Sequence, residues 1–112
     1  MGVVRNVLTA GTGAIPNKGD KITVHCTGYV QKSATERSKF WSTLDTNEPF
    51  AFNVGLGQVI KGWDEGMLQM AIGEESELTM TPDYGYGAKG FPAWGIPPNA
   101  TLTFVIKMLK IN

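Results

Sequence analysis

Two patterns in the sequence predict an α+β fold in which an antiparallel β-sheet wraps around one short helix. Several segments alternate polar and apolar residues, as half-buried strands do. Only one segment, near residues 60–70, repeats apolar residues at spacings of three and four, as a helix does. One amphipathic helix and a sheet with one apolar face bury each other most simply when the helix packs across the sheet. We therefore expect the sheet to curve around this helix.

The strands are expected at residues 3–9, 21–26, 50–54, 77–81 and 101–111. In the second of these segments, Ile22, Val24 and Cys26 share one face. The last segment is the longest and the richest in β-branched residues. Its apolar face holds Leu102, Phe104, Ile106 and Met108. These faces should pack against the helix.

The predicted helix carries an apolar stripe made of Val59 or Ile60, Trp63, Met67 and Met70. Gly62 and Gly66 lie in the same segment, although each costs a helix roughly 1 kcal/mol relative to Ala. Propensity does not explain glycine there, so we expect a sheet or a ligand to approach the helix backbone closely. Gly73 is well placed to end the helix. At its start, backbone N–H groups without a helical partner should lie beside the apolar stripe.

Two stretches lack a regular pattern and are expected to be loops, at residues 31–39 and 83–100. The second is longer than the roughly 12–15 residues usual for a connection without regular structure, and such loops are commonly functional. Its large apolar side chains are Tyr84, Tyr86, Phe91, Trp94 and Ile96. The pattern leaves two interpretations open, in which these residues either pack the loop onto the domain or contact a ligand.

Length and composition predict a single domain covering residues 1–112. Ten basic residues balance ten acidic ones, and no cluster of Lys or Arg is interleaved with aromatic residues, so nucleic acid is not an expected partner. No apolar run approaches the roughly 18 residues of a membrane span, and the chain does not begin with the apolar core of a signal peptide. The single cysteine excludes an internal disulfide. We therefore expect a cytoplasmic protein that does not interact with membranes.

No residues form a clear nucleophilic or nucleotide-binding site. Residues 85–90 match the G-x-G-x-x-G dinucleotide motif in letters, but Pro92, Pro97 and Pro98 follow where a helix should begin. His25 and Cys26 are neighbours in a strand and point to opposite faces, so they cannot act as a nucleophile and its base. We expect Cys26 to be a small core or pocket-wall residue and His25 a polar surface residue.

Acid–base and metal chemistry are not expected either. The acidic residues near the helix, Asp64, Glu65, Glu74 and Glu75, have the distribution of a solvated face. One histidine and one cysteine are too few for a usual metal site, so neither a metal nor another cofactor is expected. What remains is an apolar, aromatic recess with few polar groups.

Three ordered motifs resemble those of the FKBP prolyl isomerases, the immunophilins that bind the macrolides tacrolimus and rapamycin. They are VIKGWDEG at residues 59–66, PDYGYG at 82–87 and IPPNATL at 96–102. The resemblance extends to residues 24–28 and 47–50, and so covers essentially the whole chain. It implies a five- to six-stranded antiparallel sheet around one short helix, in agreement with the patterns. It also implies an activity, the cis/trans rotation of X-Pro bonds in peptides and proteins that contain proline.

The resemblance further implies the residues of the site. The proline ring is expected to rest on Trp63, and the backbone N–H of Ile60 and the hydroxyl of Tyr86 are expected to bind substrate carbonyls. The resemblance assigns catalysis to Trp63, Tyr86, Phe40 and Phe104. It assigns substrate and macrolide binding to Cys26, Phe40, Trp41, Phe50, Gln58, Val59, Ile60, Trp63, Tyr86, Phe91, Ile96 and Phe104.

Two positions depart from the best-known small members of this family, which carry Tyr where this chain has Cys26 and Asp where it has Trp41. Both changes replace a hydrogen-bonding group by a more apolar one. The loop around Trp94 and Gly95 is also longer than in those members, which could narrow the entrance of the pocket. We therefore expect reduced isomerase activity and weaker macrolide binding.

Three functions follow from these observations. The first is a cytoplasmic, monomeric prolyl isomerase. The alternative is a non-catalytic or weakly catalytic module of the same fold that binds proline segments or a macrolide. A third is a plain interaction domain with an occluded pocket. Faster isomerisation distinguishes the enzyme, and a saturable change in Trp63 emission without faster isomerisation distinguishes the binding module.

Overall fold

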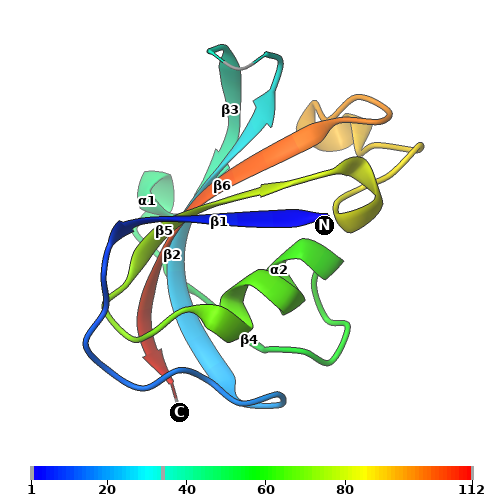
Figure 1. Ribbon diagram of the computed structural model, residues 1–112. Helices are drawn as coiled ribbons and strands as arrows, with labels where there is room; N and C mark the ends of the chain where they lie inside the picture. Colours follow the sequence, from blue (N-terminus) through cyan, green and yellow to red (C-terminus); the bar gives the residue numbers. More distant parts are fainter. Residues whose placement is uncertain (1, 34, 112) are drawn as a thin grey trace.

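The computed structural model describes residues 2–33 and 35–111 of the chain. They form one antiparallel sheet in the order β1-β5-β6-β2-β3. The sixth strand, β4, pairs with the first half of β2, and β3 pairs with the second half. The strands of the sheet are β1 (Val3–Thr9), β2 (Lys21–Gln31), β3 (Arg37–Ser42), β4 (Phe50–Asn53), β5 (Glu75–Met80) and β6 (Thr101–Ile111). The sheet curves around the helix α2 (Lys61–Gly66), which confirms the predicted fold class (Figure 1).

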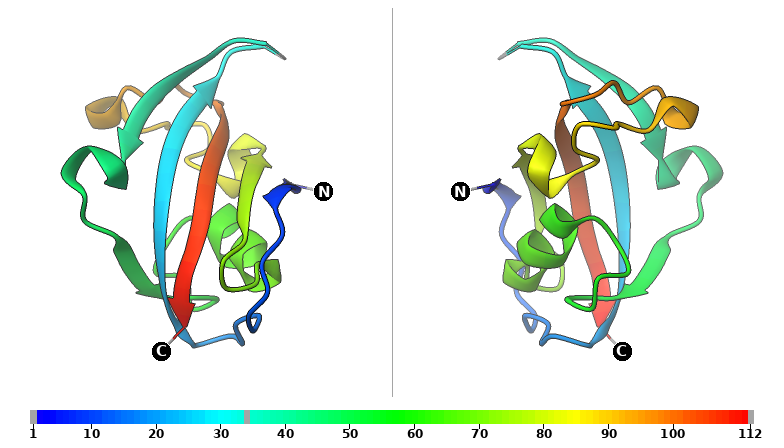
Figure 2. Two further views of the ribbon diagram at one scale, coloured as in Figure 1. Left: turned by 90° about the vertical axis from the view of Figure 1, so that its left-hand side faces the viewer. Right: turned by 90° about the vertical axis from the view of Figure 1, so that its right-hand side faces the viewer.

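The centre of the sheet is formed by β2 and β6, which lie side by side along their length (Figure 2). Their pairing runs from Ile22 opposite Ile111 to Gln31 opposite Thr101. The face toward α2 is buried at Ile22, Val24 and Cys26 of β2 and at Leu102, Phe104, Ile106 and Met108 of β6. The period-two prediction is confirmed for both strands, although β2 continues beyond the predicted end at residue 26.

The apolar stripe of the predicted helix is buried against the sheet. The exposed fraction of Trp63 is 5%, and Met67 and Met70 are fully buried. The helix is shorter than predicted, because α2 changes into the 3-10 helix η1 (Met67–Gln69) and the backbone is already extended at Met70. Gly73 therefore lies in the turn that follows. Among the described residues, no helix is long and apolar enough to cross a membrane.

Gly62 and Gly66 allow α2 to approach β5 closely. A Cβ at Gly62 would overlap the sulfur of Met80, and a Cβ at Gly66 would lie 2.6 Å from a methyl group of Leu78. Both partners project from the buried face of β5. The expectation that a sheet approaches the helix backbone is confirmed.

Two elements were not predicted from the sequence. Residues 31–39 were expected to be a loop, but β3 begins at Arg37 within this range. The helix α1 (Thr43–Thr46) follows β3, and the hydroxyl of Ser42 caps its start by accepting a hydrogen bond from the N–H of Leu44. In the predicted loop at 83–100, the only helical elements are the short 3-10 helices η2 (Pro82–Tyr84) and η3 (Pro92–Trp94).

Glu74 corrects the prediction that the acidic residues near the helix form a solvated face. Its side chain is buried, and one carboxylate oxygen lies 3.1 Å from the Arg5 guanidinium. The hydroxyl of Ser76 and the N–H of Ala71 also donate to the carboxylate, at 2.6 and 3.1 Å. A buried carboxylate is tolerated because these donors replace water. Glu74 therefore ties β1 to the start of β5.

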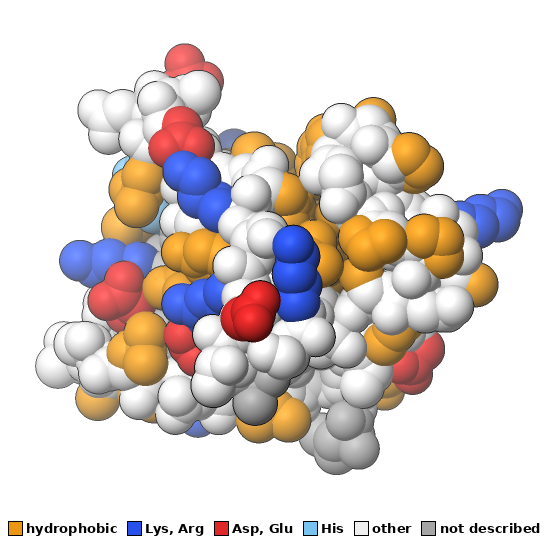
Figure 3. Space-filling view, turned by 90° about the horizontal axis from the view of Figure 1, so that it is seen from above, with side chains coloured by type: hydrophobic (Ala, Val, Ile, Leu, Met, Phe, Trp, Pro, Cys, Tyr) orange, Lys and Arg blue, Asp and Glu red, His pale blue; other side chains and the backbone are white. Residues whose placement is uncertain are grey.

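Charged side chains are mixed on the surface. On the face seen in Figure 3, basic and acidic groups alternate with hydrophobic side chains, and no large patch carries a single sign. The formal net charge of the chain is zero.

Candidate functional site

A pocket of about 210 Å³ opens between the start of α2, the strands β3, β4 and β6, and the loop at residues 82–100. Figure 1 shows how distant segments meet here, because the first turn of α2 lies on the same side of the molecule as this loop. The wall of the pocket is mostly aromatic and aliphatic. Its lining residues are Trp41, Phe50, Gln58, Val59, Ile60, Trp63, Tyr86, Trp94 and Phe104. We call it the aromatic pocket.

Trp63 forms the floor of the aromatic pocket. Its ring lies 5.1 Å from the ring of Phe104 on β6 and 5.7 Å from the ring of Phe50 on β4, with planes at 87° and 71°. The quadrupoles of aromatic rings favour this edge-to-face arrangement. The neighbouring rings hold the indole in place, so a ligand meets a fixed apolar surface.

The indole N–H of Trp63 is buried and has no hydrogen-bond partner among the described residues. An unpaired buried donor costs about 1–3 kcal/mol, and such groups are uncommon in folded proteins. Departures from the usual rules of stability concentrate at functional sites. The unpaired donor therefore marks the floor of the pocket as a candidate for function.

A β-bulge in β3 brings two neighbouring residues into one aromatic cluster. In a regular strand, Phe40 and Trp41 would point to opposite faces. The register between β2 and β3 shifts between Gly28 and Tyr29, which leaves Phe40 as the extra residue of the bulge. Both rings therefore reach Trp94, with centroid distances of 6.4 Å from Phe40 and 6.1 Å from Trp41.

Gly28 on β2 makes room for these rings. A Cβ at this position would lie 2.6 Å from the ring of Phe40 and 2.8 Å from the ring of Phe104. The two rings meet edge to face beside Gly28, with centroids 5.8 Å apart and planes at 85°. A larger residue would displace Phe104 from its contact with Trp63.

The loop at residues 82–100 forms the other wall. Phe91 stacks on Trp94 with centroids 4.8 Å apart, and Tyr86 lies 5.4 Å from Phe91. Two backbone hydrogen bonds between Phe91 and Ile96, of 2.9 and 3.1 Å, close the tip of the loop, and Ile96 is buried. The packing interpretation is confirmed for Ile96, whereas Tyr86 and Trp94 line the pocket, where contact with a ligand stays a prediction.

The loop before α2 is fixed by side-chain acceptors. The carboxylate of Asp64 accepts hydrogen bonds from the N–H groups of Gly55 and Gly57, at 2.9 and 2.8 Å. The side-chain oxygen of Gln58 accepts a hydrogen bond of 2.9 Å from the N–H of Asn53. These contacts set the position of the segment that leads into α2 and the pocket.

Two polar groups of the pocket are free to bind a ligand. Ile60 is the N-cap of α2, and its N–H donates to no other group among the described residues. The side chain of Tyr86 lines the pocket, and burial raises the pKa of its phenol. The hydroxyl therefore keeps its proton at neutral pH and can donate a hydrogen bond. The pocket thus combines an apolar wall with two hydrogen-bond donors.

Nucleophilic chemistry has no support at this site. Cys26 is buried on the face toward the core, and burial raises the pKa of its thiol from 9.0 to about 12. The thiolate, which is the reactive form, is therefore absent at neutral pH. His25 lies on the other face of β2, where Nδ1 is 2.9 Å from the hydroxyl oxygen of Thr43. No group of three or more metal-ligating side chains occurs among the described residues.

The structure brings most of the residues assigned by resemblance to the wall of one pocket, with four exceptions. Cys26 and Ile96 are buried away from the wall, and Phe40 and Phe91 contact its rings from outside. Trp94 lines the pocket but was not among the assigned residues. Its position in a long aromatic loop was the one signal in the sequence that could have identified it.

Comparison with known proteins identifies relatives over the whole chain. The family model described as FKBP-type peptidyl-prolyl cis-trans isomerase matches residues 13–109. The peptidyl-prolyl cis-trans isomerase FKBP12 of Vicia faba is 54% identical over 111 residues, which cover 98% of each chain. The protein of the same name from Arabidopsis thaliana is 51% identical over 100% of both chains. FK506-binding protein 1A of Aspergillus fumigatus is 52% identical over 100% of this chain and 96% of its own.

Proposed function

Because the chain belongs to the FKBP-type peptidyl-prolyl cis-trans isomerase family, we propose that its aromatic pocket is where it accelerates rotation about X-Pro peptide bonds. The observation that carries this proposal is the combination of a fixed indole floor with two free hydrogen-bond donors, the N–H of Ile60 and the hydroxyl of Tyr86. A prolyl amide needs no more than an apolar seat for its ring and partners for its carbonyls. No covalent step is required.

The apolar wall can lower the barrier to rotation. Uncatalysed rotation faces about 18–20 kcal/mol and takes tens to hundreds of seconds for X-Pro bonds. The planar amide is stabilised by charge-separated resonance, which is lost when the bond twists. A pocket that excludes water disfavours the planar ground state more than the less polar twisted state, and so reduces the difference between them.

Each residue assigned to catalysis has a distinct role in this proposal. Trp63 supports the proline ring, and Phe104 fixes Trp63 by its edge-to-face contact. Phe40 contacts Phe104 from the outer side and acts through it as a positioning residue. Tyr86 donates its hydroxyl hydrogen to a substrate carbonyl, and the N–H of Ile60 binds a second carbonyl at the start of α2.

Short peptides should bind weakly. A proline ring hides roughly 100 Å² of apolar surface, worth about 2.5 kcal/mol at ~25 cal/mol per Å² before the costs of binding. A ligand that also covers the rim gains more area for a similar loss of freedom. Relatives named FK506-binding protein indicate such a ligand, and we propose that this pocket binds the macrolides FK506 (tacrolimus) and rapamycin.

Exchange spectroscopy on an X-Pro peptide tests the enzyme. We expect the exchange between cis and trans signals to accelerate when the protein is added, and to return toward the uncatalysed rate with excess rapamycin. Unchanged exchange at high protein concentration would contradict the proposal. Acceleration that persists under saturating rapamycin would assign the activity to another part of the surface.

The second candidate function is a binding module with little catalysis. Trp41 favours it, because its indole lies in the pocket 5.9 Å from Trp63, at the position where the resemblance implies an Asp. A binding module would show a saturable change in tryptophan fluorescence with proline peptides, but no faster exchange. The same peptide titration therefore distinguishes the two functions.

We also propose that the chain acts as a monomeric, single-domain protein in the cytoplasm. One continuous sheet and one buried free cysteine support this proposal. Light scattering should give the mass of one chain, and urea unfolding should follow one transition when monitored by both fluorescence and circular dichroism. A dimer mass or two separate transitions would contradict it.

A further inference from the structure

Trp41 occupies part of the aromatic pocket and links its floor to its rim. Its ring lies 5.9 Å from Trp63 on the floor and 6.1 Å from Trp94 on the rim. The planes of Trp41 and Trp94 differ by only 11°, so the two indoles are stacked. Phe50 meets Trp41 edge to face at 6.3 Å. The Trp41 side chain therefore spans the pocket between its floor and its rim.

The free volume of the pocket agrees with this partial filling. Pockets that bury drug-sized ligands usually measure about 300–1,000 Å³. The aromatic pocket measures about 210 Å³, which is below this range. A single proline ring is much smaller than a drug-sized ligand, whereas a macrolide is a large one. In the observed arrangement, the pocket suits the smaller ligand.

The two indoles of the stack are held differently. Trp41 belongs to β3 and is half-buried between other rings. Trp94 lies on the 3-10 turn η3, and 43% of its surface is exposed. The following residue, Gly95, has φ of +72°; a Cβ added there would meet no atom within 4 Å, and its N–H donates to the carbonyl of Pro92 at 3.0 Å. Displacing Trp94 therefore breaks ring contacts but no strand pairing.

We propose that the Trp41–Trp94 indole stack determines the ligand specificity of the pocket by size, admitting a proline ring but requiring the indoles to separate before a macrolide can bind. This inference rests on the proposed function of the aromatic pocket, and it explains why that pocket would prefer a proline ring to a macrolide. The absence of the usual carboxylate at position 41 is a different cause, because it removes an attractive group. The stack instead obstructs the macrolide, and any small side chain at position 41 or 94 relieves this obstruction.

Single substitutions separate the two causes. Trp41→Ala and Trp94→Ala remove one indole each, and Trp41→Asp introduces the carboxylate as well as space. Trp41→Phe and Trp94→Phe are matched controls that keep an aromatic ring at each position. Val4→Ala, at an exposed site on β1 outside the pocket, controls for substitution in general. Circular dichroism and thermal melting identify any variant that does not fold, and the exposed position of Trp94 makes its variants the safer pair.

Isothermal titration with tacrolimus measures the effect without relying on tryptophan fluorescence. We expect Trp41→Ala and Trp94→Ala to tighten binding by about tenfold or more, the phenylalanine variants by less than about threefold, and Val4→Ala to leave it unchanged. In the exchange assay, the alanine variants should act less efficiently on a short prolyl peptide, because they lose apolar wall. Opposite changes for the large and the small ligand are the signature of selection by size.

Two results would overturn the inference. Equal or weaker tacrolimus binding by both alanine variants would show that the stack does not obstruct the ligand. Tighter binding by Trp41→Asp alone would assign specificity to the carboxylate. If the wild-type protein fails to accelerate exchange, the proposed enzymatic function fails, but the tacrolimus titrations still decide whether the stack excludes large ligands.

Discussion

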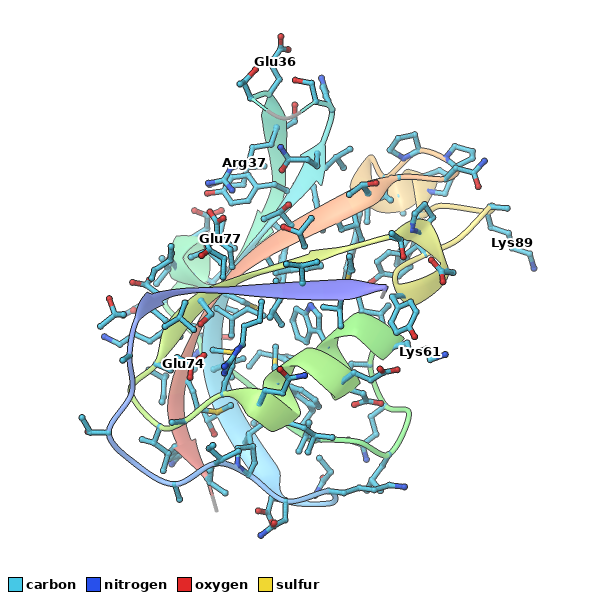
Figure 4. The ribbon with its side chains drawn as sticks, in the orientation of Figure 1. Glu36, Arg37, Lys61, Glu74, Glu77 and Lys89 are labelled. Atoms are coloured by element: carbon cyan, nitrogen blue, oxygen red, sulfur yellow. The ribbon has the colours of Figure 1, made fainter. Side chains whose placement is uncertain are left out.

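The two faces of the sheet show opposite ways of using side chains. On the outer face lies a polar cleft lined by Gln31, Thr35, Arg37, Glu77, Thr79 and Thr103, which we call the outer cleft. Arg37 and Glu77 point toward one another across it, with their charged atoms 3.0 Å apart (Figure 4). The aromatic pocket on the inner face is built from rings instead.

The difference lies in how completely the polar groups are paired. In the outer cleft, the hydroxyl of Thr103 donates to Gln31 at 2.9 Å and lies 3.3 Å from the hydroxyl of Thr79. In the aromatic pocket, the N–H of Ile60 has no partner among the described residues, and the indole N–H of Trp63 is also unpaired there but is fully buried, so the donor left for a ligand is that of Ile60. Paired groups have little left to offer a ligand, whereas unpaired donors gain from one. Pairing, rather than polarity, thus distinguishes the candidate site from the outer cleft.

The largest effect is expected from truncating the floor of the aromatic pocket. Trp63→Ala should lower the free energy of unfolding by about 3–5 kcal/mol, because it leaves a cavity among Phe50, Phe52 and Phe104. Thr79→Ala in the outer cleft should cost about 1 kcal/mol, the usual worth of one hydrogen bond. Urea denaturation measures both. Equal losses of unfolding free energy in the two variants would contradict the claim that the two faces of the sheet differ.

A smaller loss is expected from overfilling the wall of the pocket. Gly28→Ala places a methyl group against Phe40 and Phe104, and should cost about 1–3 kcal/mol. Because Phe104 then shifts against Trp63, isomerase efficiency should fall as well. Stability and exchange measurements on the same variant check both effects. Full activity would show that the position of Phe104 is not important.

The buried thiol should make stability depend on pH in the alkaline range. The pKa of Cys26 rises from 9.0 to about 12 on folding, so between these values the unfolded chain loses a proton that the folded chain keeps. The free energy of unfolding should therefore fall with rising pH above 9.0, by at most about 1.4 kcal/mol per pH unit from this group. Other groups titrate here too, so the measurement is the difference from Cys26→Ala. Parallel curves for the two proteins would contradict the prediction.

The smallest effect is expected in the outer cleft. Arg37 pairs with Glu77 and lies 4.2 Å from the centre of the Tyr29 ring, but it is exposed. Surface ion pairs usually contribute about 0–1 kcal/mol, so Arg37→Ala should change stability by no more than that. Urea unfolding at low and high salt checks this value. If Arg37→Ala lowers the free energy of unfolding by more than about 2 kcal/mol, the outer cleft stabilises the fold and the prediction is contradicted.

The sequence predicted those features that depend on local periodicity. Strands β1 and β6 were found at their predicted bounds, and the buried faces of β2 and β6 were those expected from alternation. The glycines of α2 were explained by the approach of β5. Each of these features follows from residues that are close in sequence and repeat with a fixed period.

The features that could not be predicted depend on contacts distant in sequence. Strand β3 lies at the edge of the sheet and is largely exposed, so its sequence has no alternation of polar and apolar residues. Its bulge also leaves Phe40 without a partner on β2, which breaks the alternation of side-chain directions. Glu74 is buried because Arg5 from the far end of the chain pairs with it. Trp94 lines the pocket because an irregular loop packs over β3 and places its ring against Phe40 and Trp41.

One measurement tests most directly the claim that the inner face carries the activity. Exchange rates of an X-Pro peptide are compared for the wild-type protein, Trp63→Leu in the aromatic pocket, and Arg37→Ala in the outer cleft, after each is shown to be folded. We predict that Trp63→Leu lowers the acceleration by about tenfold or more, while Arg37→Ala stays within about twofold of wild type. An Arg37→Ala protein as impaired as Trp63→Leu, or a folded Trp63→Leu protein with full activity, would contradict the account.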